Sequence, residues 1–347
     1  MEAHTIHRAA GADVIAIGSG ANGAKSDDVS LLGHLVWFSV SEMEVKRDDL
    51  LGAIEDSGLG ERFAPGEISP RDAFRRATSS LGRSRVPVTA SATTRLFGDE
   101  KRHANLLVRD VRTNGETLIR QLVREVVDSE GATLAHEAVV QFDLSPSEEM
   151  RTFARLRPLL TAEEEIVAEA AEAFEKAKEH YDSGAVRRTV GRALSECSPV
   201  ALRASGGVYF IPRSHEPEVR AVERFIGELK DRVQGGDDGA PNGTTGTLFM
   251  AVELADREDY RDVIAASLEE QVGREANALV REMADILKRQ RSITKRRQED
   301  LFERVRRLGG AVREYEGLLE REISDARANL ELAKSEAVSL LSKVEVK

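Results

Sequence analysis

The chain has 347 residues, of which 41% are hydrophobic, 32% charged and only 5% aromatic, and its formal net charge is -11. This length allows two or three domains, and the composition indicates a globular protein with an unusual share of solvated helix. The negative charge argues against a surface that attracts nucleic acid everywhere, although a local basic site stays open. One cysteine, Cys197, excludes an intrachain disulfide and a thiolate zinc site. We expect a cytoplasmic protein without a signal peptide or membrane-spanning segment.

The amino-terminal half is predicted to be α+β. Residues 1–28 are assigned to a flexible amino terminus, and residues 29–160 to an α+β domain with an antiparallel meander. Before the meander, the order of the residues predicts three elements. The first is a strand over His34–Val40. The second is a helix over Arg47–Ser57 that ends at Gly58, and the third is a helix that begins at Ser69 with Pro70 in its first turn.

Residues 104–144 predict the meander, because Asn114-Gly115 between two β-rich runs is typical of a two-residue hairpin turn. A second turn is predicted at Asp128 to Gly131. Counting outward from the first turn predicts these positions on the buried face: Leu106, Val108, Ile119, Val123, Leu134, His136, Ala138, Val140 and Phe142.

The same register places Arg109 opposite Arg120, with Arg124 two residues further on. Like charges across paired strands repel, so we expect something to neutralise them. One candidate is Glu137, which the register places opposite Leu122. The other is an anion or a nucleic-acid phosphate bound on this face.

Two capping boxes follow, Ser145 to Glu148 and Thr161 to Glu164, and each predicts a helix start. A third short helix is predicted over Val186–Glu196, and then two short strands joined at Ser205-Gly206-Gly207. This order within residues 161–233 is similar to a winged helix, whose last helix enters a DNA major groove. The residues that would contact nucleic acid are Arg187, Arg188, Arg192 and Arg203.

Residues 234–246 are predicted to be a linker, and residues 247–347 a strand followed by a long helical arm. Apolar residues in the arm recur in alternating steps of four and three, which is typical of a coiled-coil seam that mediates oligomerisation. The seam comprises Leu301, Val305, Leu308, Val312, Tyr315, Leu319, Ile323, Ala326, Leu330, Ala333, Ala337, Leu340 and Val344. Gly309-Gly310 interrupts a run of good helix formers, so the arm could be an antiparallel hairpin that folds back at these glycines or one long rod. A third possibility is that the whole stripe packs on the amino-terminal domains.

The most basic stretch of the chain lies just before this seam and contains no acid. It comprises Lys288, Arg289, Arg291, Lys295, Arg296 and Arg297. Such a run is either a solvated helix face or a contact for phosphates or an acidic partner.

The glycine-rich segment Gly18 to Gly23 matches the dinucleotide pattern G-x-G-x-x-G. The helix that this pattern requires is poorly supported, and Lys25 stands one residue late for a phosphate loop. Nucleotide binding would use Gly18, Gly20, Gly23 and Lys25; the alternative is a flexible turn. The histidines have no ligand spacing, and no complete catalytic motif occurs. We therefore predict no catalytic residue, no metal site and no cofactor.

Three stretches resemble an uncharacterised protein family that is associated with actinobacteria and their phages. They are LLGHLVWFSVSEMEVKRDDLLGAIEDSGL, ISPRDAFRRATSSL and ALRASGGVYFIPRSHEPEVRAVERF, and the resemblance covers most of residues 30 to 230. It implies a phage-linked or mobile-element setting but no activity.

Three hypotheses for function follow. The first is a non-enzymatic assembly protein that binds itself or a protein partner through its C-terminal helices. The second is a nucleic-acid-binding protein that uses the winged-helix-like segment and the basic patches. The third is a nucleotide-binding enzyme built around Gly18 to Gly23.

Overall fold

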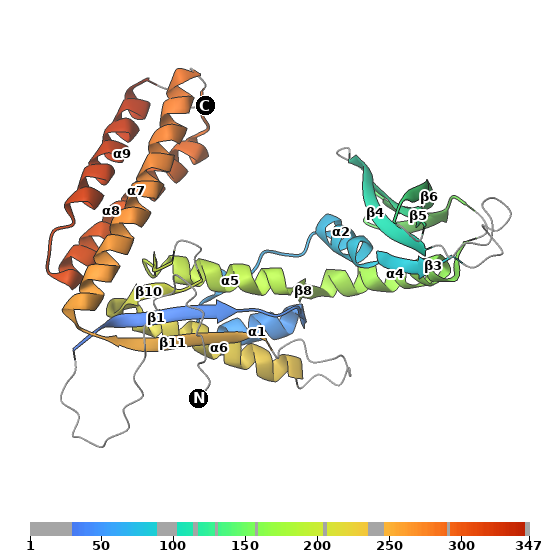
Figure 1. Ribbon diagram of the computed structural model, residues 1–347, viewed down its shortest axis with the longest axis horizontal. Coiled ribbons are helices and arrows are strands. Elements are labelled where there is room, and N and C mark those ends of the chain that lie inside the picture. Colours follow the sequence, from blue (N-terminus) through green and yellow to red (C-terminus); the bar gives the residue numbers. More distant parts are fainter. Residues whose placement is uncertain are drawn as a thin grey trace, which may run out of the picture.

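The computed structural model describes residues 30–88, 103–113, 117–128, 131–156, 159–203, 207–234, 246–289 and 292–343. Its outline is elongated, with two lobes at opposite ends of a central layer (Figure 1). One lobe is formed by the C-terminal helices and the other by the meander. The fold is mixed α+β with antiparallel sheets, as predicted. None of the helices in the described residues has the length and apolar content needed to cross a membrane.

The helices are α1 (Arg47–Ser57), α2 (Pro70–Ser80), α4 (Thr161–Glu179), α5 (Ser183–Ser195), α6 (Glu216–Gln234), α7 (Glu258–Lys288), α8 (Lys295–Leu319) and α9 (Ser324–Lys343). The strands are β1 (Leu31–Ser39), β2 (Glu44–Lys46), β3 (Arg83–Pro87), β4 (His103–Thr113), β5 (Leu118–Val127), β6 (Thr133–Leu144), β7 (Met150–Ala154), β8 (His180–Asp182), β9 (Val200–Ala201), β10 (Tyr209–Pro212) and β11 (Leu248–Ala255). Two short 3-10 helices cover Glu61–Phe63 and Arg213–His215.

The central layer is a four-stranded antiparallel sheet in the order β11-β1-β10-β9. One face packs on α1, α5 and α6 through Val36, Ile211 and Phe249. Leu32 and Phe210 pack in the core of the C-terminal helices. Gly33 allows β10 to approach closely, because a Cβ atom there would lie 2.1 Å from the carbonyl oxygen of Ile211. The sheet therefore joins the first described strand to elements far along the chain.

The local signals before the meander are confirmed. Helix α1 ends at Gly58, which has a left-handed φ of 71°. Helix α2 begins after Ser69, whose hydroxyl accepts a hydrogen bond of 3.1 Å from the backbone N–H of Asp72. These elements depend on neighbouring residues alone, so the sequence was sufficient to locate them.

The meander is a five-stranded sheet in the order β3-β4-β5-β6-β7, and α2 and α4 cover one face. Its predicted register is wrong. A two-residue turn would pair Thr113 with residue 116, but Thr113 pairs with Leu118. A bulge between Asp110 and Arg112 then reduces the offset to one residue, which pairs Arg109 with Gln121 and Asp110 with Arg120. A slip of one residue reverses the faces of a strand. Leu118, Leu122 and Val126 of β5 are therefore buried and Ile119 is only partly buried, whereas Val123 is buried as predicted.

Further along the meander, a second irregularity separates the pairs Leu122–Val140 and Val123–Ala138. Glu137 consequently lies opposite Arg124, so the predicted pairing of Glu137 with Leu122 is wrong. Val140 and Phe142 are buried as predicted, whereas Leu134 and His136 are exposed. The Asn114-Gly115 turn lies outside the described residues.

The helix predicted from Ser145 to Glu148 is absent from this described segment. The backbone N–H of Glu148 donates to the carbonyl oxygen of Ser145 at 2.9 Å, and Glu148 has a φ of 64°. This left-handed residue turns the chain back, so that β7 extends the sheet instead. The second capping box does begin a helix, α4.

Helices α7, α8 and α9 lie side by side (Figure 1) and share one apolar core. All the predicted seam positions from Leu301 to Leu340 are buried in that core; Val344 lies outside the described residues. Of the alternatives left open at Gly309-Gly310, neither the fold-back at the glycines nor one long rod is observed, since α8 continues through them to Leu319 and the chain reverses at Glu320, whose φ is 52°. A Cβ atom on Gly309 would lie 3.4 Å from Leu330, so this glycine serves close packing of α8 and α9.

Candidate functional site

The C-terminal helices carry the basic run at the turn between α7 and α8. Among its described members, Lys288, Arg289, Lys295, Arg296 and Arg297 are all exposed, and Arg291 lies outside the described residues. Arg289 forms an ion pair of 2.9 Å with Asp285, and Arg297 is paired with Glu282. Residues 281–307 contain ten cationic and five acidic residues, so this end of the helices carries an excess of positive charge.

Helix α9 exposes large apolar side chains on the surface that its seam leaves free. Leu332, Val338 and Leu341 are 52%, 65% and 55% exposed. Val338 and Leu341 are three residues apart in the helix and are therefore neighbours on its surface. Helix α9 runs beside α7 in the same direction (Figure 1). Because Val338 and Leu341 lie near the end of α9, they lie toward the α7–α8 turn. The exposed apolar pair Val338 and Leu341 therefore lies at the same end of the helices as the basic α7–α8 turn.

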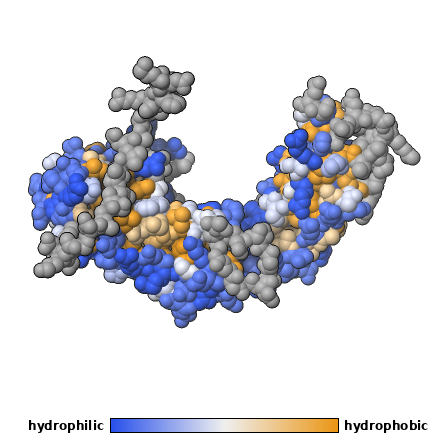
Figure 2. Space-filling view, turned by 60° about the horizontal axis from the view of Figure 1, so that its bottom comes forward, coloured by the Kyte–Doolittle hydropathy of each residue, from blue (hydrophilic) through white to orange (hydrophobic). Residues whose placement is uncertain are grey.

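Figure 2 shows a second apolar surface, on the lobe at the right that contains the meander. The large apolar side chains exposed in this part of the chain are Val111, Leu134, Phe153 and Leu156. They come from β4, β6, β7 and the residues just after β7, and no two of them are paired across neighbouring strands.

The arginines of the meander do not form one exposed face. Arg109 is exposed, but Arg120 and Arg124 are each 7% exposed and lie over α2 and α4. Arg120 forms an ion pair of 2.9 Å with Asp110 and donates to the carbonyl oxygen of Arg75 at 2.8 Å. Both arginines have intramolecular partners in acids that the predicted register did not identify.

Arg124 is neutralised by Glu163, in the first turn of α4. Its Nε donates to Glu163 Oε1 at 2.6 Å, and its Nη2 donates to the other carboxylate oxygen. Glu163 is fully buried and also accepts a hydrogen bond of 2.9 Å from the backbone N–H of Leu160. The pair therefore fastens α4 to the meander.

The segment predicted to resemble a winged helix contributes its strands, β9 and β10, to the central sheet. Two of its arginines bind main-chain oxygens: Arg187 donates to Val40 at 2.6 Å, and Arg192 donates to Phe63 at 2.6 Å. Arg188 and Arg203 are exposed. The four arginines therefore do not share one free surface. The glycine-rich segment from Gly18 to Gly23 and Lys25 lie outside the described residues.

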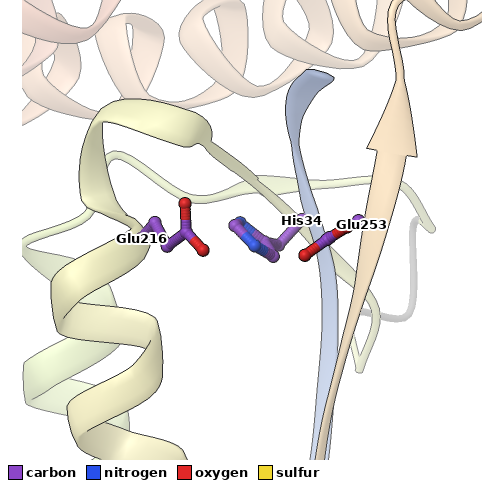
Figure 3. Close-up of side chains that lie close together, drawn as sticks. All are labelled: His34, Glu216 and Glu253. Atoms are coloured by element: carbon purple, nitrogen blue, oxygen red, sulfur yellow. The ribbon is translucent and has the colours of Figure 1, made fainter. Parts of the chain in front are cut away.

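A further cluster joins the central sheet to the start of α6, and sequence reasoning missed it. His34 of β1 pairs directly with Glu253 of β11, and Glu216 is the first residue of α6. One ring nitrogen of His34 and one carboxylate oxygen of each glutamate all lie within 4.8 Å of one another. Figure 3 shows the imidazole between the two carboxylates. No sequence spacing predicts this cluster, because it depends on the pairing of distant strands.

The imidazole of His34 is 1% exposed, and neither ring nitrogen has a hydrogen-bond partner. Burial lowers its pKa below the usual 6.5, helped by Arg220 and Arg213 and opposed by Glu216 and Glu253. Arg220 lies 3.8 Å from Glu216 and 3.2 Å from Glu253, and it also contacts Glu223 at 3.0 Å. The carboxylates of Glu216 and Glu253 therefore share the guanidinium of Arg220, which also pairs with Glu223.

Helix α8 provides one of the attachments of the C-terminal helices to the central layer. Tyr315 is fully buried, its ring meets that of Phe210 edge to face, and its hydroxyl donates to the carbonyl oxygen of Ser198 at 2.7 Å. Next to it, Glu314 accepts a 2.7 Å hydrogen bond from Ser214 and lies 3.0 Å from Nε2 of His215. Tyr315, predicted as an oligomerisation residue, thus packs within the chain.

The ionisation of Glu314 makes the stability of this attachment depend on pH. Burial raises the pKa of Glu314, but contacts with His215, Ser214 and Ser198 outweigh it and lower the pKa from 4.5 to about 2. The folded pKa is depressed, so the stabilisation is present above 4.5 and is lost as pH falls toward 2. We expect Glu314→Gln to reduce the free energy of unfolding at pH 7 and to flatten its decline in that window. Urea unfolding between pH 2 and 7 measures both, and parallel curves for the variant and the natural chain would contradict this assignment.

Comparison with known protein families identifies the family of this chain. The chain matches the family described as "Family of unknown function (DUF6744)" over residues 31–346. The chain belongs to this family. The DUF6744 match extends the expected resemblance, which ended near residue 230, through the C-terminal helices. No curated protein and no solved structure matches the chain.

Proposed function

We propose that this DUF6744 chain is a non-enzymatic interaction protein that self-associates through the outer surface of its C-terminal helices. The observation that carries the proposal is the exposed pair Val338 and Leu341 beside the basic α7–α8 turn. The heptad seam is already buried within the chain, so the C-terminal helices would associate through this other surface. Apolar side chains flanked by charge are typical of protein interfaces.

Charge favours a second copy as the partner. Residues 281–307 carry an excess of five positive charges, which leaves -16 for the rest of the chain. The basic turn of one copy is therefore complementary to the acidic surface of another. In the proposed assembly the outer face of α9, and not the heptad seam, makes the contact between copies.

Mass in solution tests this proposal. We expect the natural chain to shift from monomer to oligomer as its concentration rises in analytical ultracentrifugation. Val338→Ser with Leu341→Ser should weaken the association at least about tenfold, since each removes buried apolar area at the contact. Val263→Ser is the matched control, because Val263 is 47% exposed but lies at the opposite end of α7. A natural chain that stays monomeric, or equal loss in the control, would overturn the proposal.

A second candidate is nucleic-acid binding by the same basic turn. Exposed Lys288, Lys295 and Arg296 favour it, and exposed Arg188 and Arg203 would serve the winged-helix hypothesis instead. We expect Lys295→Glu with Arg296→Glu to weaken binding to DNA or RNA and to lower its salt dependence. Arg188→Glu with Arg203→Glu is the comparison pair. Absence of binding at low salt would exclude both sites. The phage-linked setting is a separate proposal, for which gene neighbourhoods are the test.

A further inference from the structure

We propose that His34, Glu216 and Glu253 bind a divalent transition-metal ion, with zinc as the representative case. The first argument is geometric. The three donor atoms lie within 4.8 Å of one another, and nitrogen and oxygen ligands bind zinc at about 2.0–2.2 Å. Ligands around one such ion therefore stand roughly 3–4 Å apart, so the three donor atoms would move closer together when they bind the ion.

The second argument comes from His34 itself. Burying a polar group without a hydrogen bond costs about 1–3 kcal/mol, so a buried imidazole with two unpaired nitrogens needs a physical reason. The ring lies between the carboxylates of Glu216 and Glu253 (Figure 3), which is where a bound cation would satisfy one nitrogen and both acids. This buried and unpartnered side chain distinguishes the cluster from an ordinary group of surface acids.

The rest of the surroundings fit entry and exchange of an ion. His34 closes the inner side, while the side chains of Glu216 and Glu253 are 38% and 52% exposed and open the site to solvent. In the absence of the ion, Arg220 supplies a positive charge to both carboxylates. Its third partner, Glu223 at 3.0 Å, can hold the guanidinium when the ion takes its place.

The donor set selects the class of ion. An imidazole nitrogen with two carboxylates suits zinc, manganese, iron or cobalt, whereas calcium and magnesium prefer oxygen ligands alone. Three protein ligands leave at least one coordination position for water or an anionic group. The ion would also join β1, β11 and α6, which are distant in sequence.

Calorimetric titration of the full chain with zinc chloride, after removal of metal by a chelator, tests the proposal. We expect one ion per chain, and a loss of affinity of at least about tenfold for Glu253→Gln. This variant keeps the shape of a half-exposed side chain, so it should fold. Glu218→Gln is the matched control on the same helix and should bind as the natural chain does. Arg220→Met should bind zinc more tightly, because it removes the competing cation.

Cobalt absorption supplies a second measurement. Cobalt bound at this site should lose its spectrum in Glu253→Gln and in His34→Asn but keep it in Glu218→Gln. His4 and His7 lie outside the described residues, and their substitution should leave the signal unchanged. Zinc binding that is absent in the natural chain, or equal in Glu253→Gln, would overturn the proposal.

Discussion

Glu163→Ala should lower the free energy of unfolding by about 3–5 kcal/mol, because it leaves the guanidinium of Arg124 buried without its counter-charge. Glu163 is fully buried, and the side chain of Arg124 is 8% exposed, so water cannot replace the lost carboxylate. The substitution also removes the acceptor for the backbone N–H of Leu160 at the start of α4. The meander lobe should be the part that unfolds first.

Urea unfolding followed by circular dichroism measures this loss. Glu164→Ala is the matched control, since Glu164 is exposed one residue further along the same turn, and it should change stability by less than about 0.5 kcal/mol. Replacing both partners, Arg124→Met with Glu163→Leu, should recover most of the loss, because no buried charge is then left alone. A cost near 1 kcal/mol for Glu163→Ala would mean that Arg124 finds another partner.

Tyr315→Ala should cost about 3–5 kcal/mol, the usual range for removing a large buried aromatic side chain. Tyr315→Phe keeps the contact with Phe210 but loses the hydrogen bond to Ser198, and should cost about 0.5–1.5 kcal/mol. The joint between the C-terminal helices and the central sheet is the affected region.

The same unfolding measurements test Tyr315, with the exposed neighbour Arg313→Ala as control. Ultracentrifugation of Tyr315→Phe provides a second reading. If Tyr315 formed an intermolecular seam, the variant would change the mass in solution more than the stability of the monomer. An unaltered free energy of unfolding would show that the joint does not depend on this side chain.

The sequence predicted elements well where their signals are local. Ser69 and Gly58 bound their helices by bonds to near neighbours, and the heptad positions from Leu301 onward are buried. The predicted register of the meander was wrong because the bulge next to Asp110 has no strong sequence signal, and the one-residue offset beyond it exchanges the faces assigned to β5. The turn at Glu320 was missed for a similar reason, since a left-handed glutamate contradicts ordinary residue preferences.

The candidate sites were harder to predict than the elements. Arg124 finds Glu163 only because α4 crosses the meander, and His34 finds Glu253 only because β1 pairs with β11. Neither contact has a recognisable spacing in sequence. The basic run around Arg296 was visible in the sequence, but its neighbour Leu341 became relevant only after α9 was placed beside α7.

The pairing of β1 with both β10 and β11 also bears on how the chain folds during synthesis. Strand β1 is translated first, but β11 follows about 200 residues later, which takes roughly 10–40 s at typical translation rates. The meander with α2 and α4 consists of closer segments and can form in the meantime, since short-range contacts form faster. Until β11 emerges, the edge of β1 is open to pairing with other chains, so the C-terminal third protects the N-terminal strand from aggregation.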